Sequence, residues 1–277
     1  MYKNVLVVLA SMVLFVFPVA SFSQTDFSLK GKTVSFCGDN SEWAPFHFYE
    51  RGDDGKRTDE IVGFDIDLLR DILKENGINS HFSLLPWKRC LDYVKKNENF
   101  QVVLSATANS ERERDYLISS AYYTNTPSYF YVKNKFPTAP LVQKSSDLAE
   151  YRLCGRFGYN YANFGLENAK IDQGAKNFSV LRKKVLKNHC DFFLARFETL
   201  AAQALTGKDL LSDGKLGYAP LQDVKPEPFV LLISKEYKHA EELKKIIKAG
   251  VAERYRLGRL DKMLKQYIPD AFIKLPE

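Results

Sequence analysis

Two kinds of side chain in this sequence could bind a small molecule: an arginine that lies close to hydroxyl residues along the chain, and the two tryptophans. Arg112 lies in a Glu-Arg-Glu-Arg run, and Ser105 and Thr107 precede it by a few residues. A guanidinium group can form two parallel hydrogen bonds with a carboxylate. Trp43 and Trp87, the two tryptophans of the chain, could add flat apolar walls and cation–π surfaces. Residues of these types can bind small molecules.

The chain lacks the short motifs of several enzyme and metal-binding classes. It contains no GxSxG, Walker A, GxGxxG or HExxH sequence and no CxxC pair. Its histidines share no metal-ligand spacing; they are His47, His81, His189 and His239. We predict no catalytic residue, no metal site and no cofactor, although spacing along the chain does not test a triad assembled in space.

The chain has four cysteines, which allow three pairings. An even number favours disulfides in an oxidising compartment. Cys37 and Cys90 lie in the first part of the chain, and Cys154 and Cys190 in the middle. We therefore predict the pairs Cys37–Cys90 and Cys154–Cys190, with free buried thiols as the alternative.

The N-terminus has the pattern of a secretory signal peptide. Lys3 precedes an apolar stretch at residues 5–19, and small residues follow up to Ser23. The stretch is shorter than the roughly 20 residues of a membrane span, which is the alternative interpretation. The first cysteine is Cys37, too far along for a lipid anchor at the cleavage site. We expect cleavage after residue 23 and a mature chain free in the periplasm.

Length and charge narrow the remaining classes. Cleavage would leave roughly 250 residues, enough for one large domain or two small ones. The net charge is +6, and basic residues alternate with acidic ones rather than clustering. A nucleic-acid-binding face would need a basic cluster. We therefore expect a globular protein with a solvated surface and no nucleic-acid partner.

Apolar periodicity predicts an α/β protein. Strands at 33–37, 81–85 and 101–104 alternate with helices that start at Phe64 and after Pro86. This order is typical of a domain with a parallel sheet. The pattern repeats with a strand at 128–132, a helix at 181–186 and a strand at 191–195, and a strand at 229–233 and helices at 239–255 and 260–267 follow.

Four sequence blocks, in order, make the chain similar to the bacterial extracellular solute-binding proteins of family 3, the polar amino-acid group. They are GD and WAPF within 38–46, GFDIDL at 63–68, LPWKR at 85–89, and SAT and ER within 105–112 followed by Ser119. The stretch 243–267, which includes LGRL at 257–260, resembles the closing helices of the family. The resemblance spans nearly all of the mature chain.

The resemblance implies a two-lobed, periplasmic-binding-protein-like fold of type II with the ligand cleft between the lobes. Lobe 1 would comprise residues 24–123 and 229–277, and lobe 2 residues 124–228. The chain would cross between lobes near 123–127 and near 227–229. Two crossings form a hinge, so ligand binding could close the lobes.

The resemblance also implies a set of ligand-binding residues. Arg112 matches the arginine that binds a ligand carboxylate, with Arg114 as the competing candidate in the same run. Thr107 and Ser105 match the positions that add a hydroxyl and a backbone contact. The remaining matches are Trp43 and Trp87 as aromatic walls, Asp39 for an amine or the hinge, and Tyr159 and Asn160 from a loop of lobe 2.

One position departs from the family. Where amino-acid binders offer an acidic residue to the ligand's α-ammonium, this chain has Arg196. Glu198 could replace the lost acid. A ligand with a second negative group, or with no amine, is one interpretation; the other is that Arg196 pairs with an acid and the ligand is still an amino acid.

We expect a monomeric transport receptor that hands a carboxylate-bearing solute to an inner-membrane ABC permease. A dehydratase-like periplasmic enzyme on the same fold is the alternative, with Glu198 or Asp39 as its acid or base. A ligand-sensing subunit of a membrane signalling system is a third possibility. We expect no direct membrane anchor.

Overall fold

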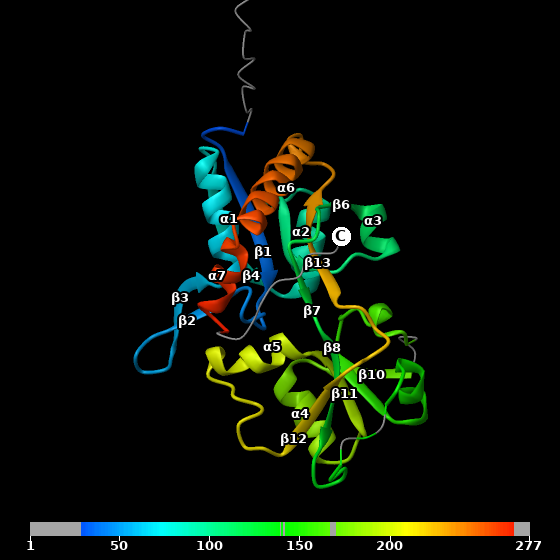
Figure 1. Cartoon of the computed structure of the whole chain (residues 1–277). Helices are drawn as coiled ribbons and strands as arrows, with labels where there is room; N and C mark the ends of the chain where they lie inside the picture. Colours follow the sequence, from blue (N-terminus) through cyan, green and yellow to red (C-terminus); the bar gives the residue numbers. More distant parts are fainter. Residues whose placement is uncertain (1–28, 139, 141, 167–169, 269–277) are drawn as a thin grey trace, which may run out of the picture.

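The computed structural model describes residues 29–138, 140, 142–166 and 170–268, which form two lobes stacked one above the other in Figure 1. The predicted signal peptide at residues 1–23 lies outside the described residues. Within the described residues, no helix is long and apolar enough to cross a membrane.

Lobe 1 is built on a six-stranded sheet with the order β4-β1-β5-β13-β6, and β7 also pairs with β13. β1, β4 and β5 are parallel, as predicted, but β13 runs antiparallel to β5 and to β6. The sheet is therefore mixed, because β13 returns from lobe 2 in the opposite direction. The strand bounds are β1 Thr33–Asp39, β4 Asn79–Leu85, β5 Val102–Ala106, β6 Tyr116–Ile118, β7 Tyr123–Asn125 and β13 Glu227–Ser234.

Helices cover both faces of this sheet (Figure 1). α1 (Phe64–Glu75), α6 (Ala240–Arg256) and α7 (Arg259–Lys265) pack together on one face, and α2 (Trp87–Lys95) lies on the other. Each long helix buries an apolar stripe, which in α1 includes Leu68, Leu69 and Ile72. The short helix α3 (Ser110–Asp115) follows β5, and a hairpin of β2 (Phe48–Arg51) and β3 (Arg57–Val62) precedes α1.

Lobe 2 is built on a five-stranded sheet with the order β10-β9-β11-β8-β12. α4 (Phe178–Leu186) packs on this sheet, and a separate cluster of buried aromatic and aliphatic side chains includes Tyr129, Phe164 and Phe192. The strand bounds are β8 Pro127–Val132, β9 Leu153–Arg156, β10 Ile171–Ala175, β11 Phe192–Arg196 and β12 Leu216–Pro220. The other helices are α5 Phe197–Ala201 and the 3₁₀ segments η1 Ser145–Glu150, η2 Ala162–Phe164 and η4 Ala202–Thr206.

Two adjacent segments join the lobes. The chain passes from β7 to β8 and returns from β12 to β13, and β7 pairs with the first residues of β13. Tyr123 and Phe229 face each other at this crossing, with ring centroids 4.7 Å apart. The arrangement agrees with the two crossings that the resemblance implies, while the residue bounds assigned to each lobe stay a prediction.

The structure contains both predicted disulfides. Cys37 in β1 joins Cys90 in α2, and Cys154 in β9 joins Cys190 just before β11, with S–S distances of 2.07 and 2.05 Å. Each bond closes a loop within one lobe, so each restricts the unfolded chain without limiting movement between lobes.

Candidate functional site

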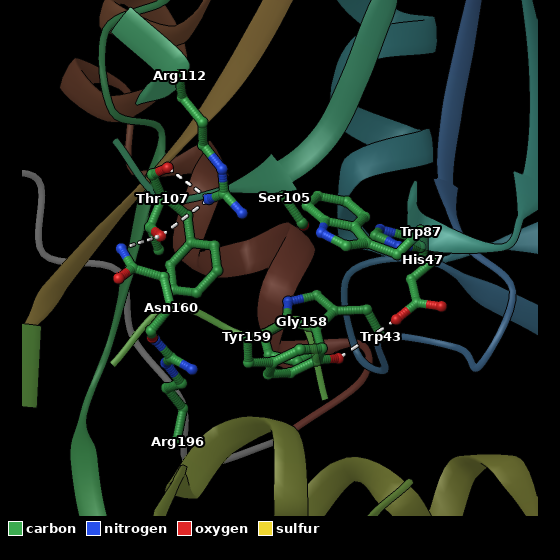
Figure 2. A pocket seen from close by; sticks show the side chains of 12 residues that line it. Trp43, His47, Trp87, Ser105, Thr107, Arg112, Gly158, Tyr159, Asn160 and Arg196 are labelled. Atoms are coloured by element: carbon green, nitrogen blue, oxygen red, sulfur yellow. Dashed lines mark hydrogen bonds between the residues drawn. The ribbon is translucent and has the colours of Figure 1, made fainter. Parts of the chain in front are cut away.

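A cavity lies between the lobes and contains every residue that the sequence predicts to contact a ligand. The space amounts to about 390 Å³ with its open mouth included, near the lower end of the range for small-molecule pockets. Figure 2 shows these side chains around one space. The predicted residues that line it are Asp39, Trp43, Trp87, Ser105, Thr107, Arg112, Tyr159, Asn160 and Arg196, and His47, Gly158 and Phe229 line it as well.

Strand ends explain why these residues meet. Asp39 ends β1, Ser105 and Thr107 lie at and just beyond the end of β5, and Arg196 ends β11. β1 and β5 are parallel neighbours in lobe 1, and β9 and β11 in lobe 2. The carboxyl ends of parallel strands open at the same edge of a sheet, which is where α/β folds bind ligands.

Arg112 offers an unpaired positive charge to the cavity. Its Nη1 donates to the carbonyl oxygen of Thr107 at 2.6 Å and to the hydroxyl oxygen at 3.1 Å. The side chain of Asn109 caps α3 by accepting a hydrogen bond from the backbone nitrogen of Arg112. Within the described part of the chain, Nε and Nη2 have no partner and no carboxylate pairs with this side chain.

Burial lowers the pKa of Arg112, and the nearby charge of Glu227 opposes that change. A guanidinium group stays protonated at neutral pH even so. The guanidinium carbon also lies 5.5 Å from the centroid of the Trp87 ring, a cation–π contact. Arg112 is therefore a partly desolvated cation with free donors, which is the condition for strong binding of an anion. The competing candidate, Arg114, is exposed and pairs with Asp115 outside the cavity.

Ser105 is part of a buried network rather than a free hydroxyl. It donates to Oδ2 of Asp65 at 2.7 Å and accepts from the hydroxyl of Tyr123 at 2.7 Å. Its φ of 49° lies in the left-handed region, which a non-glycine residue adopts only where its surroundings hold it. Asp65 is fully buried and also accepts from Tyr122, so the strand end is held tightly.

Aromatic rings form one wall of the cavity. Trp43 is only 5% exposed, and its ring centroid lies 5.3 Å from that of Tyr159 and 5.8 Å from that of Phe229. Its indole nitrogen donates to the hydroxyl of Tyr123 at 3.1 Å. The polar edge of Trp43 is therefore already used, and the ring presents an apolar face. Trp43 therefore packs in the core and lines the cavity at the same time.

A tight loop of lobe 2 brings Tyr159 and Asn160 to the cavity. Gly158 has a φ of +74°, a conformation that favours glycine, at the turn that presents both side chains. Asn160 donates from Nδ2 to the hydroxyl of Thr107 in lobe 1 at 3.1 Å. Burial raises the pKa of Tyr159 well above its usual value, so its hydroxyl stays neutral.

Arg196 pairs with an acid, as one of the two interpretations of its sequence position expected. Its guanidinium group forms a buried ion pair with Glu227, the first residue of β13. Nη2 also donates to the carbonyl oxygen of Asn160 at 2.8 Å. Glu198, the other candidate acid, does not line the cavity: its carboxylate accepts from the backbone nitrogen and hydroxyl of Thr126 near the crossing.

Asp39 is engaged across the cleft. Its carboxylate lies 3.3 Å from Nη2 of Arg156 in β9 and accepts from the hydroxyl of Tyr159 at 3.4 Å. Arg156 is buried and lies over the rings of Tyr159 and Phe178. These contacts, with the one between Asn160 and Thr107, hold the lobes together around the cavity.

Sequence reasoning missed four residues at the site, one of which is Gly158 of the turn described above. Nδ1 of His47 lies 3.0 Å from Oδ2 of Asp65, and its Nε2 is buried and has no partner among the described residues. Glu227 carries the ion pair to Arg196, and Phe229 completes the aromatic wall. Phe229 starts a predicted apolar strand, so its position was a usable signal, whereas nothing in the sequence points to the partners of His47 or Glu227.

Comparison with known proteins finds similar chains of comparable length. A curated relative, named "Probable histidine-binding protein", from Campylobacter jejuni, is 21% identical over 237 residues, which are 83% of each chain. A structure of an ABC transporter binding component from Wolinella succinogenes, complexed with lysine, is 20% identical with a TM-score of 0.67, covering 86% of this chain and 97% of that one.

A third similar structure is an ancestral amino-acid-binding protein, described as a precursor of cyclohexadienyl dehydratase. It is 19% identical with a TM-score of 0.63, and the match covers 85% of this chain and 95% of that one. At these identities the structures establish the two-lobed fold. The model of the bacterial extracellular solute-binding proteins, family 3, matches residues 36–270. The chain belongs to this family, whose members capture small solutes for ABC importers.

Proposed function

We propose that this protein captures a small carboxylate-bearing solute, an amino acid or a related compound, in the cavity between its lobes. The observation that carries the proposal is Arg112, a half-buried guanidinium group with free donors and no acidic partner among the described residues. Leaving a buried charge unpaired is costly, and a ligand carboxylate would satisfy it with two charge-assisted hydrogen bonds.

The rest of the cavity suits a small organic acid. Thr107 lies beside Arg112 and could add a hydroxyl contact, while Trp43, Tyr159 and Phe229 offer apolar surface to the remainder of the ligand. The ligands named for two relatives are histidine and lysine. Both are small molecules that carry a carboxylate. They support the class of solute and leave its identity open.

We also propose delivery to an inner-membrane ABC permease, and the hinge between the lobes supports it. Two chain segments join the lobes, and contacts such as Asp39–Arg156 close the cleft over the cavity. A binding protein whose shape differs between the empty and the loaded form gives its importer a way to select the loaded form. We propose that residues 1–23 direct the chain to the periplasm and are then removed, and that the protein works there as a monomer.

A second candidate function is dehydratase-like catalysis, favoured by the histidine and carboxylate pair at the cavity and by the ancestral neighbour. An oriented histidine can act as a general base. However, Nε2 of His47 is buried against Gly38, where an added Cβ would lie only 2.6 Å from it. Asp39 and Glu198 are held by Arg156 and Thr126. Binding without chemistry therefore fits the cavity better.

A thermal-shift panel tests the proposal. The mature protein is refolded to remove carried ligand and screened with amino acids, other carboxylates, amines and sugars. Ligand at 100 times its dissociation constant adds about 2.7 kcal/mol to the stability of the folded state. We expect shifts with carboxylates only, lost in Arg112→Met and kept in Arg114→Met, the exposed neighbour. Shifts that persist in Arg112→Met, or that occur only with sugars or amines, would overturn the proposal.

A further inference from the structure

The carboxylates near the cavity are all committed to partners within the protein. Asp39 accepts from the backbone nitrogen of Ser41 and from Tyr159, and it pairs with Arg156. Glu227 is 1% exposed, pairs with Arg196 and accepts from Nδ2 of Asn163 at 2.9 Å. Neither side chain has an oxygen that lacks a donor.

The two remaining candidates are likewise engaged. Asp65 is fully buried and accepts from Ser105 and Tyr122, with His47 against the same carboxylate. Glu198 accepts twice from Thr126 and lies outside the cavity. Within the described part of the chain, each acid at or beside the cavity therefore already has donors from the protein on its carboxylate.

The unpaired charge at the cavity is positive. Arg112 has no acidic partner, and Nη1 of Arg196 has no partner among the described residues although its other nitrogens bond Glu227 and Asn160. Figure 2 shows the two guanidinium groups on either side of Asn160, with both turned toward the cavity. One guanidinium thus comes from each lobe.

An α-ammonium group would meet this positive charge. It stands on the carbon next to the carboxylate, so a ligand held by Arg112 must place it within the same small cavity. A buried ammonium without an acidic partner is strongly unfavourable, and a nearby guanidinium repels it. The aromatic wall of Trp43, Tyr159 and Phe229 instead suits an uncharged, apolar or aromatic group.

We infer that the ligand is a carboxylate that carries no α-ammonium group, because Asp39, which lines the cavity, and Glu227, which pairs with the lining residue Arg196, are both already paired with arginines. The inference rests on the proposed function, in which Arg112 binds the carboxylate. It narrows that function to amine-free organic acids.

Matched pairs of ligands test the inference. Isothermal titration of the refolded protein at neutral pH compares L-phenylalanine with 3-phenylpropanoate, L-leucine with 4-methylpentanoate, L-histidine with 3-(imidazol-4-yl)propanoate, and L-glutamate with glutarate. Each pair differs only in the α-ammonium. We expect the amine-free member to bind ~10-fold tighter or more in the pairs that bind at all. Equal or tighter binding of the amino acid would overturn the inference.

A variant of Arg196 tests whether this residue causes the discrimination against the α-ammonium group. Arg196→Gln removes the cation and frees the carboxylate of Glu227, so the ratio of affinities should shift by ~10-fold or more toward the amino acid. Arg152→Gln is the matched control, because Arg152 also pairs with an acid in lobe 2 but lies away from the cavity. An unchanged ratio in folded Arg196→Gln would overturn the inference. If Arg196→Gln does not fold, the matched ligands measured on the wild-type protein still test the inference.

The failures of the two proposals are distinguishable. If amino acids bind tightest and binding is lost in Arg112→Met, only the inference about the ammonium is wrong. If no carboxylate binds, or if binding survives in Arg112→Met, the proposed function is wrong and the inference falls with it.

Discussion

Arg112 and Arg196 carry the same guanidinium group, but their partners give them different roles. Arg112 bonds only neutral oxygens of Thr107 and keeps its full charge for a ligand. Arg196 is compensated by Glu227 within the protein. A buried ion pair adds little net stability, yet the loss of one partner leaves an uncompensated charge. We therefore expect the Arg196–Glu227 pair to affect which ligands bind in the cavity more than it stabilises the fold.

Removing the charge of Glu227 should show this directly. Glu227→Gln leaves Arg196 buried without an acid, and we expect the free energy of unfolding to fall by about 3 kcal/mol. The double variant Arg196→Met with Glu227→Gln removes both charges and should lose less than the single variant. Urea denaturation measures both single variants, Arg196→Met and Glu227→Gln, and the double variant. A double variant that loses the sum of both single effects would show that the ion pair is unimportant.

Residue positions at the cavity were predictable from the sequence, whereas their partners were not. The sequence blocks around Trp43, Trp87 and Arg112 named residues that do line one cavity. The pairing of Arg196 with Glu227 joins the end of β11 to the start of β13, which are separated along the chain and meet only at the crossing. Contacts of that kind depend on the relative position of two lobes, which no local pattern encodes.

At the scale of elements, most strands inside a sheet were predictable, although the interior strand β9 was missed; of the edge strands, β4 was predicted and β6 was not. β1, β5, β11 and β13 are rich in apolar and β-branched residues and were expected close to where they lie. β10 and β12 were missed. Both are edge strands that contain glycine, which weakens a strand pattern, and β12 ends in proline, which cannot donate to a neighbouring strand. α3 was missed because it buries no residue and so has no apolar stripe.

The contact that joins the starts of β9 and β11 should depend on pH. Arg152, with Lys135, holds the pKa of Asp191 well below its usual value. A depressed pKa stabilises the fold above the unfolded pKa of about 3.9, and that stability is lost as the pH falls below it. Both basic partners are largely exposed, so solvent screens the pair and its contribution is modest.

We therefore expect Asp191→Asn to lower the free energy of unfolding by about 1 kcal/mol at pH 7. The difference from wild type should shrink below about pH 4, where Asp191 of the unfolded wild type is protonated. Urea denaturation at several pH values measures it. A difference that stays constant down to pH 3 would mean that packing, and not charge, explains the effect.

At the scale of the whole molecule, the lobes touch through contacts placed around the cavity. Arg156 of lobe 2 reaches Asp39 and Ser41 of lobe 1, and Arg51 of lobe 1 donates to the carbonyl oxygen of Thr206 in lobe 2 at 3.1 Å. The two-segment crossing leaves these contacts free to form and break by rotation. The cavity is enclosed when the two lobes close on each other.

Loss of the Arg156 contact should favour the open form. In Arg156→Gln we expect a larger radius of gyration without ligand and a Kd for a bound carboxylate about 3 to 10 times higher, because less of the protein is closed. Small-angle X-ray scattering and isothermal titration measure the two quantities. Arg152→Gln, which alters a pair inside lobe 2, should change neither. A closed, tight-binding Arg156→Gln would show that other contacts set the closure.

The most direct test of the account is a crystal structure of the protein with the tightest-binding compound of the panel. The account predicts the ligand in the cavity between the lobes, with a carboxylate oxygen about 2.7–2.9 Å from free guanidinium nitrogens of Arg112. The rest of the ligand should lie against Trp43 and Tyr159, with no ammonium near Arg196. A ligand whose carboxylate lies away from Arg112, or a ligand outside this cavity, would contradict the account.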